Sequence, residues 1–273
     1  MLVPLAARAD WRYFDAEYRI YAAGILFAKV ELQLDVSETD YRLSAHIAPA
    51  LIGRLASNTH VVVETRGRFT NGAFVPQKLD LNWVRERQIK TTYMRYQNGA
   101  PTEFVSAYQP SDEQLPVVPV NILEVGSGTL DPFTAMLLPI SSGGLNRACD
   151  ADIQLFDGRR RAALQLVDPR PVAAAAHDYT TKIDALACTV LWTPIAGYSK
   201  AALERAADLP PVKTHYGRIA DTPLAAPLEM RGQSKYGNIS IYAVRFFTES
   251  DTPLPAFNIA DYIPPAPDID DLD

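Results

Sequence analysis

The chain has 273 residues, of which 48% are hydrophobic and 21% charged, and its formal net charge is −6. This balance is typical of a folded globular protein and excludes a disordered chain, a coiled coil, a collagen-like rod and a disulfide-rich miniprotein. The 21 prolines disfavour long helices and favour strands joined by turns.

The negative charge is concentrated at the C-terminus. The segment 261–273 contains five aspartates and no Lys or Arg, so residues 1–260 are close to neutral. A near-neutral body provides no basic field for a phosphate backbone, which argues against nucleic-acid binding. The one basic run, Arg159–Arg161, is expected at a solvated hairpin edge. No run of 18 apolar residues occurs, so no transmembrane helix is expected.

The N-terminus resembles the end of a signal peptide. Ala7-Arg8-Ala9 before Asp10 fits the small-x-small pattern of a signal-peptidase site, after a short apolar stretch. We therefore interpret residues 1–9 as a signal-peptide remnant, with coincidence as the alternative. The predicted location is the periplasm. Secretion is one alternative, and the cytoplasm is the other if residues 1–9 are not such a remnant.

The cysteine count supports export. Cys149 and Cys188 form an even pair, which predicts a disulfide in an exported chain; two unconnected buried thiols are the alternative. None of the four histidines lies within five residues of another, so no metal site and no cofactor are expected. No catalytic motif is found, and no catalytic residue is predicted.

Period-two alternation dominates the chain and predicts strands. From Phe14 to Val36 every even position is apolar or Gly and most odd positions are polar, with a break expected near Ala23-Gly24-Ile25. Similar strands follow from Tyr41 and Val61, and their polar faces carry His46 and His60, which we expect at the solvated surface. Hairpin turns are predicted at Asn71-Gly72, Asn98-Gly99 and Asp157-Gly158.

Two short helices are predicted. Asp131–Leu138 begins with an N-cap Asp followed by Pro, and Ser199–Asp208 is rich in helix formers and ends before two prolines. No composition shift marks a linker within residues 10–250, so we predict a single β-rich domain there. Residues 251–273 form a Pro/Asp-rich tail that is expected to be extended and partly disordered.

Strands with one apolar face and almost no covering helix must curl or stack. We predict an all-β fold with minor α: a curved antiparallel meander forming an open or half barrel. Its apolar face is either ordinary core or the lining of a cavity. The candidate lining residues are Tyr18, Ile20, Leu26, Val30, Leu32 and Leu34. The candidate lid or plug residues are Phe133, Met136 and Leu137, and the candidate lip residues are Leu51 and Ile52, which either cap the core or meet lipid or a partner.

Several of these stretches together resemble domain-of-unknown-function family 3108, a family of exported bacterial proteins. The matching stretches are Tyr18–Leu34, the strand from Tyr41, Arg66–Leu79, Asp131–Met136 and Cys149–Leu166. The resemblance covers about residues 13–247, and it implies a signal peptide and a curved antiparallel sheet similar to the half-barrels of periplasmic lipoprotein carriers. It supplies no catalytic residue.

Three functions remain open from the sequence. The first is a non-catalytic periplasmic envelope protein that binds an apolar, lipid-like ligand in an open β-barrel, since each buried methylene contributes about 0.8 kcal/mol. The second is a structural or assembly factor of the cell envelope that acts through contacts with a protein partner. The third is an enzyme whose site the sequence does not reveal.

Overall fold

The structure is a computed structural model of the whole chain, in which residues 11–50, 53–54, 58–86, 88–106, 115–140, 144–174, 183–234 and 237–263 are described. The interpretation of residues 1–9 as a signal-peptide remnant falls outside the described residues. So do the lip residues Leu51 and Ile52 and the end of the tail, 264–273.

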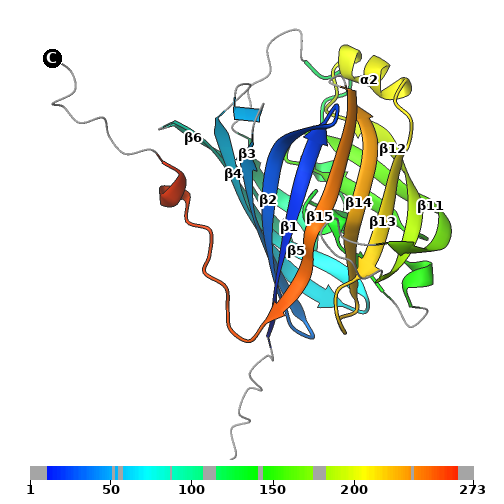
Figure 1. Cartoon of the computed structure of the whole chain (residues 1–273). Helices are drawn as coiled ribbons and strands as arrows, with labels where there is room; N and C mark the ends of the chain where they lie inside the picture. The colour runs from blue at the N-terminus through cyan, green and yellow to red at the C-terminus, as the bar shows by residue number, and fades with distance from the viewer. Residues whose placement is uncertain are drawn as a thin grey trace, which may run out of the picture.

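Strands make up most of the described chain (Figure 1). The strands are β1 Arg12–Ala22, β2 Ile25–Val36, β3 Asp40–Pro49, β4 Thr59–Thr70, β5 Ala73–Arg85, β6 Gln88–Gln97, β7 Ala100–Val105, β8 Thr129–Leu130, β9 Leu138–Pro139, β10 Asp152–Phe156, β11 Arg161–Ala174, β12 Ile183–Ala196, β13 Val212–Arg218, β14 Leu224–Ser234 and β15 Gly237–Ser250. The helical elements are the α-helix α2, Lys200–Ala207, and the 3-10 turns η2 Ile122–Glu124, η3 Thr134–Met136, η4 Leu145–Arg147 and η5 Ile259–Tyr262.

The strands form one curved, nearly closed sheet. Its order is β7-β6-β5-β4-β3-β2-β1-β15-β14-β13-β12-β11-β10-β8, and β9 pairs with β14. The pairs between long strands are antiparallel, and the short pair of β8 with β10 is parallel. The first and last long strands, β1 and β15, pair with each other, so the chain returns to its start before the tail begins. The predicted open antiparallel barrel is confirmed.

Residues that accept a positive φ set the turns. The break between β1 and β2 falls at Ala23 and Gly24, and the hairpin between β4 and β5 falls at Asn71 and Gly72, all four with positive φ. Two consecutive residues of this kind give a tight turn whose twist matches that of the strands. The predicted helix at Ser199–Asp208 is also present as α2, and the Ser199 hydroxyl accepts a hydrogen bond from the Ala202 N–H.

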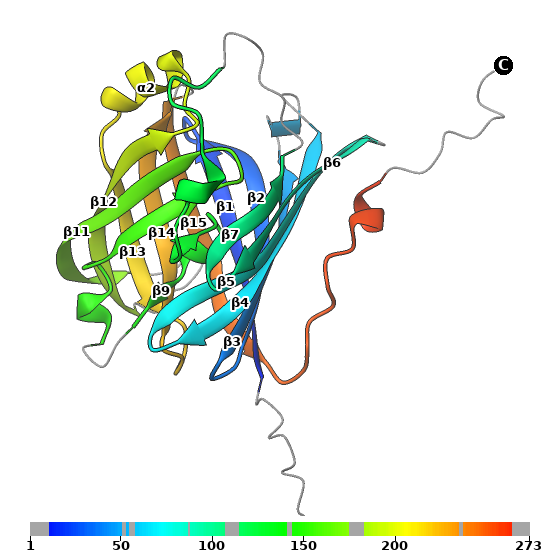
Figure 2. The ribbon, with the colours of Figure 1, turned by 180° about the vertical axis from the view of Figure 1, so that it is seen from behind.

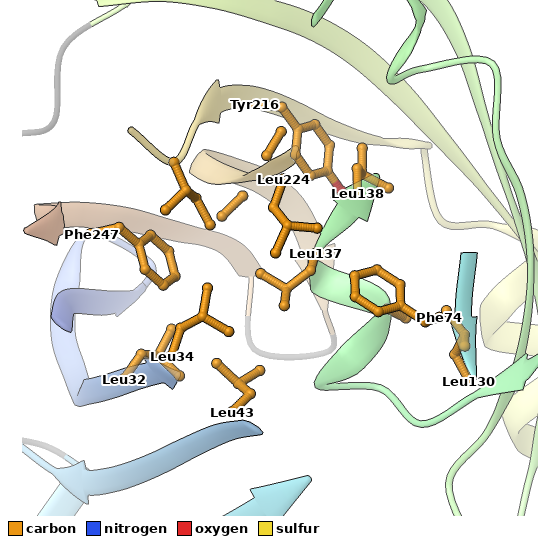
Figure 3. Packing of buried hydrophobic residues seen from close by; sticks show 14 of the residues in the cluster. Leu32, Leu34, Leu43, Phe74, Leu130, Leu137, Leu138, Tyr216, Leu224 and Phe247 are labelled. Carbon is orange, nitrogen blue, oxygen red and sulfur yellow. The ribbon is translucent and has the colours of Figure 1, made fainter. Parts of the chain in front are cut away.

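The interior of the barrel is packed around a segment of the chain itself. The connection 129–140 contains β8, η3 and β9. It lies between two walls of the barrel, one that includes β2, β3 and β5 and one that includes β13, β14 and β15 (Figure 2). Leu137 and Leu138 are buried among side chains from both walls (Figure 3). Labelled neighbours from the walls are Leu32, Leu34, Leu43, Phe74, Tyr216, Leu224 and Phe247. We call residues 129–140 the plug.

The predicted disulfide is present. Cys149 and Cys188 are bonded, with 5.9 Å between their Cα atoms, and both side chains are buried in the core. The bond joins the turn after η4 to β12 and so fixes the chain that follows the plug against the wall of the barrel.

Candidate functional site

The sheet has a seam where its two edges, β7 and β8, face each other. A backbone hydrogen bond of 3.2 Å runs from the Gly128 N–H to the Gly99 carbonyl oxygen, just before each edge strand. Further along β7, the rings of Phe104 and Phe156 pack edge to face with their centroids 5.5 Å apart. The seam is therefore closed by the backbone at one level and by aromatic side chains at another.

The β10–β11 turn rests on β6 across this seam. A Cβ at Gly158, where φ is +85°, would lie 3.3 Å from the Thr92 methyl and 3.8 Å from the Met94 sulfur. A side chain at Gly158 would have to displace those groups, and the positive φ would strain it. Glycine thus permits both the turn and the close approach of the two edges.

A groove of about 250 Å³ lies beside this contact. Its walls come from the end of β7, from the segment after β7 and from the β10–β11 turn, and most of its lining is apolar. The lining residues are Phe104, Ser106, Pro116, Pro119, Val120, Gly158, Arg159 and Gly197. We call this feature the seam groove; its volume is just below the usual range of about 300 to 1,000 Å³ for small-molecule pockets.

The segment 115–124, which we call the rim loop, carries apolar side chains into solvent beside the groove. Leu115, Val117 and Val118 are each more than half exposed, and Leu123 is 90% exposed. The loop is held in place, because the Val117 N–H donates to the Tyr198 carbonyl and the Gly197 N–H donates to the Val118 carbonyl. The loop therefore places four exposed apolar side chains next to a mostly apolar groove, whereas its Val120 and Ile122 are half-buried against the core. Exposed apolar side chains that gather beside a groove favour a binding site.

Asp131 fastens the plug inside the barrel. Its carboxylate accepts hydrogen bonds from the hydroxyls of Thr65 (2.9 Å) and Thr134 (2.6 Å) and from the N–H groups of Phe133 and Thr134 (both 3.0 Å). Burial raises the pKa of Asp131, and the hydrogen bonds from Thr134, Thr65 and Phe133 oppose that rise. All four donors are used to cap η3 and join it to β4, so this carboxylate has a structural role.

The six predicted lining residues do not line the seam groove or either of two further cavities, of about 480 and 350 Å³, among the described residues. Tyr18, Val30, Leu32 and Leu34 are packed in the core, and Ile20 lies half-buried at its margin. Leu26 leaves this set, because a register shift between Ile20 and Tyr21 pairs it with Tyr21 on the outward-facing side of β1. Residue periodicity does not reveal this bulge. On the N-terminal side of the bulge in β2, the residues that the alternation assigns to the inner face point outward.

The lid residues divide between the core and its margin. Leu137 is buried in the core, and Phe133 and Met136 are half-buried beside it. The segment that contains them is a plug with its apolar residues turned to both walls rather than a cover over an opening.

His46 and His60 are not simple surface residues. The C-terminal segment 251–263, which we call the strap, passes over the outer faces of β2 to β4: the Gln33 side chain donates to the Pro255 carbonyl, and the Tyr262 ring stacks 3.9 Å from the His46 ring. His46 is buried under it and is hydrogen-bonded to His60 (3.0 Å) and to the Glu31 carboxylate (3.1 Å). The expectation of a solvated His46 was wrong, because the strap joins the sheet from more than two hundred residues away.

Another cavity, of about 480 Å³, lies at the β1 end of the barrel. It is lined by Arg12, Val36, Ser37, Glu38, Phe69, Asp221, Thr222 and Pro223. Arg12 is already engaged there, since it donates two hydrogen bonds to the Glu249 carboxylate. No exposed apolar segment comparable to the rim loop borders this cavity among the described residues.

Within the described ranges, no cluster of three His, Cys, Asp or Glu side chains is arranged to hold a metal ion. A search of the same ranges found no helix of the length and hydrophobicity that crossing a bilayer requires.

Comparisons with known proteins give a likeness in structure and none in sequence. No protein-family model matches the chain, and no curated protein matches it in sequence. Among solved structures, the chain resembles a β-barrel-like protein of domain of unknown function DUF1849 from Brucella abortus. The two are 8% identical with a TM-score of 0.46, and the match covers 90% of this chain and 100% of the other.

Proposed function

We propose that this is a non-catalytic protein of the bacterial periplasm that binds an apolar, lipid-like chain at the seam groove and rim loop. The observation that carries the proposal is the rim loop, which holds Leu115, Val117, Val118 and Leu123 in solvent although the same connection buries its later apolar residues in the core. A ligand that covers these side chains would gain roughly 1.5 to 3 kcal/mol for each one fully buried.

The proposed ligand site lies at the seam of the barrel and not inside it, because the plug occupies part of the interior. The plug places Leu137 and Leu138 between the walls, among side chains of the core. The exposed apolar side chains that support the proposal lie outside the plug, at the seam. The seam groove supplies Phe104, Pro119 and Val120 as an apolar wall, and the rim loop extends that wall outward.

The disulfide supports the proposed compartment. Disulfides persist in oxidising compartments such as the periplasm and are rare in the cytosol. The bond between Cys149 and Cys188 is buried in the core, as expected for a structural disulfide.

The test is a titration with a dansyl-labelled undecanoate, read as an increase in fluorescence when the probe leaves water. Wild-type protein is expected to bind it, and Leu123→Asp and Val120→Asp are each expected to weaken binding about tenfold or more. Leu123 is 90% exposed, so its substitution should leave the fold intact. The Leu123 variant therefore still tests the proposal if the Val120 variant misfolds.

Leu209→Asp is the matched control. Leu209 is an exposed apolar residue after α2 that does not line the groove, so its substitution should leave probe binding unchanged. No binding by wild type, or equal binding by wild type and both site variants, would contradict the proposal and favour an assembly factor acting through protein contacts.

A further inference from the structure

The outer face of β11 to β14 carries a third pocket, of about 350 Å³, whose chemistry differs from that of the seam groove. It is lined by Arg170, Ala187, Cys188, Lys213, Thr214, His215, Glu229 and Arg231. The pairing of strands explains the outward placement. Tyr216 and Leu186 are paired and buried in the core, so the adjacent pair His215 and Ala187 faces the opposite side.

A β-bulge helps bring the cations together. The pairing of β11 with β12 shifts between Val167 and Arg170, where Asp168 has a positive φ, and this places Arg170 opposite Ala187. Arg231 lies opposite Lys213 on the neighbouring strand pair. Three basic side chains from three strands therefore border one pocket.

These cations exceed the carboxylates that could neutralise them. Glu229 is the one acidic residue in the lining, and it pairs with Arg231 and lies 3.5 Å from the His215 ring nitrogen. Lys213 donates to the Thr189 hydroxyl at 2.8 Å, and neither Lys213 nor Arg170 has an ion-pair partner among the described residues. With His215 neutral, the pocket carries a net charge of +2 on a chain whose net charge is −6.

From this arrangement we propose that the outer pocket of β11 to β14 binds a phosphate-bearing ligand, with Arg170, Lys213 and Arg231 as its donors. A phosphate group near pH 7 carries up to two negative charges and three acceptor oxygens, which match the excess charge and the number of cations. Arginine suits this task because its guanidinium can donate two parallel hydrogen bonds to one phosphate. The volume of the pocket exceeds a single phosphate and leaves room for the rest of a phosphate ester.

The test compares inorganic phosphate, glycerol 3-phosphate and phosphatidate in phosphatidylcholine vesicles. Isothermal titration at low salt is used for the first two ligands and vesicle sedimentation for the third. Binding of the soluble ligands identifies a free phosphate ester, and binding of the phosphatidate vesicles alone identifies a lipid headgroup. Either result supports the proposal if it weakens with salt and in the variants below.

Arg170→Gln and Lys213→Gln are the site variants. Each removes a charge-assisted hydrogen bond and is expected to lower affinity about tenfold. Arg218→Gln is the matched control, because Arg218 is an exposed cation on β13 outside the pocket lining. Failure of wild type to bind any of the three ligands, or equal losses in the control and in the site variants, would overturn the proposal. The seam-groove proposal would stand in either case, because its residues are separate.

Discussion

The connection between β7 and β10 contains two apolar stretches that the fold treats in opposite ways. The plug, 129–140, is buried between the walls of the barrel and fastened by the Asp131 carboxylate. The rim loop, 115–124, is held by backbone hydrogen bonds but leaves four of its apolar side chains in solvent, those of Leu115, Val117, Val118 and Leu123. The buried residues of the plug are explained by stability, whereas the exposed apolar residues of the rim loop gain nothing from the fold and support the proposed binding site.

The largest expected effect on stability comes from the disulfide that follows the plug. Replacing Cys149 and Cys188 together with Ala should lower the free energy of unfolding by about 4 kcal/mol, because the bond closes a loop with a sequence separation of 39 residues. Urea denaturation of the oxidised wild type and the double variant measures this difference. An unchanged midpoint and slope would show that the bond does not restrain the unfolded chain.

The plug and the rim loop should differ most clearly when one leucine is truncated in each. Leu137→Ala should cost about 3 kcal/mol, because it leaves a cavity in the core. Leu123→Ala should change stability by no more than about 0.5 kcal/mol, because its side chain is already in water. Equal losses of stability in denaturant titrations of the two variants would remove the distinction between the stretches.

The next largest effect on stability is expected from Asp131, which caps η3 in the plug. Asp131→Ala should destabilise the fold by about 2 kcal/mol, since it leaves the N–H groups of Phe133 and Thr134 without their acceptor inside the barrel. Asn121→Ala removes the comparable cap of η2, where the side chain accepts from the Leu123 N–H in solvent, and it should cost much less. Thermal unfolding of both variants tests the contrast.

The strap should respond to pH in a direction set by His60, whose ring stacks with that of Tyr262 in the strap. Burial, followed by His46 and Arg54, lowers the pKa of His60 below its ordinary value of 6.5. The unfolded chain then binds more protons below that pH, so this contribution to stability is present above pH 6.5 and is lost as pH falls through the lowered pKa.

Limited proteolysis of the strap, followed from neutral to mildly acidic pH, should show faster cleavage as pH falls. In His60→Gln the dependence should be weaker, because the titrating group is absent. His215→Gln is the control, since His215 lies on β13 away from the strap. A pH profile that is the same in wild type and His60→Gln would show that His60 does not control the strap.

Local alternation was enough to predict the barrel but not the features that depend on contacts between distant residues. The turn at Ala23-Gly24 and, except at Leu26, the even-numbered face of the two strands beside it follow from residue chemistry over a few positions, and both are present. The bulge that turns Leu26 outward and the strap that buries His46 depend on contacts between distant residues, which periodicity does not report.

The candidate site was less accessible to sequence reasoning. The rim loop reads as a run of valines and prolines between strands, and that excess of apolar residues in a connection was the available signal. Composition alone does not tell whether such a run is exposed, because the similar apolar run that contains Leu137 and Leu138 is buried. The structure was needed to show that the rim loop is exposed.

The most direct test of the binding proposal is a methyl NMR titration with dodecanoate, in which Leu and Val signals of the rim loop and of the plug are followed together. The proposal predicts that Val117, Val118 and Leu123 shift in a saturable way while Leu137 and Leu138 do not. Shifts confined to the plug would place the ligand in the barrel interior, and the absence of shifts at the rim loop would contradict the proposed site.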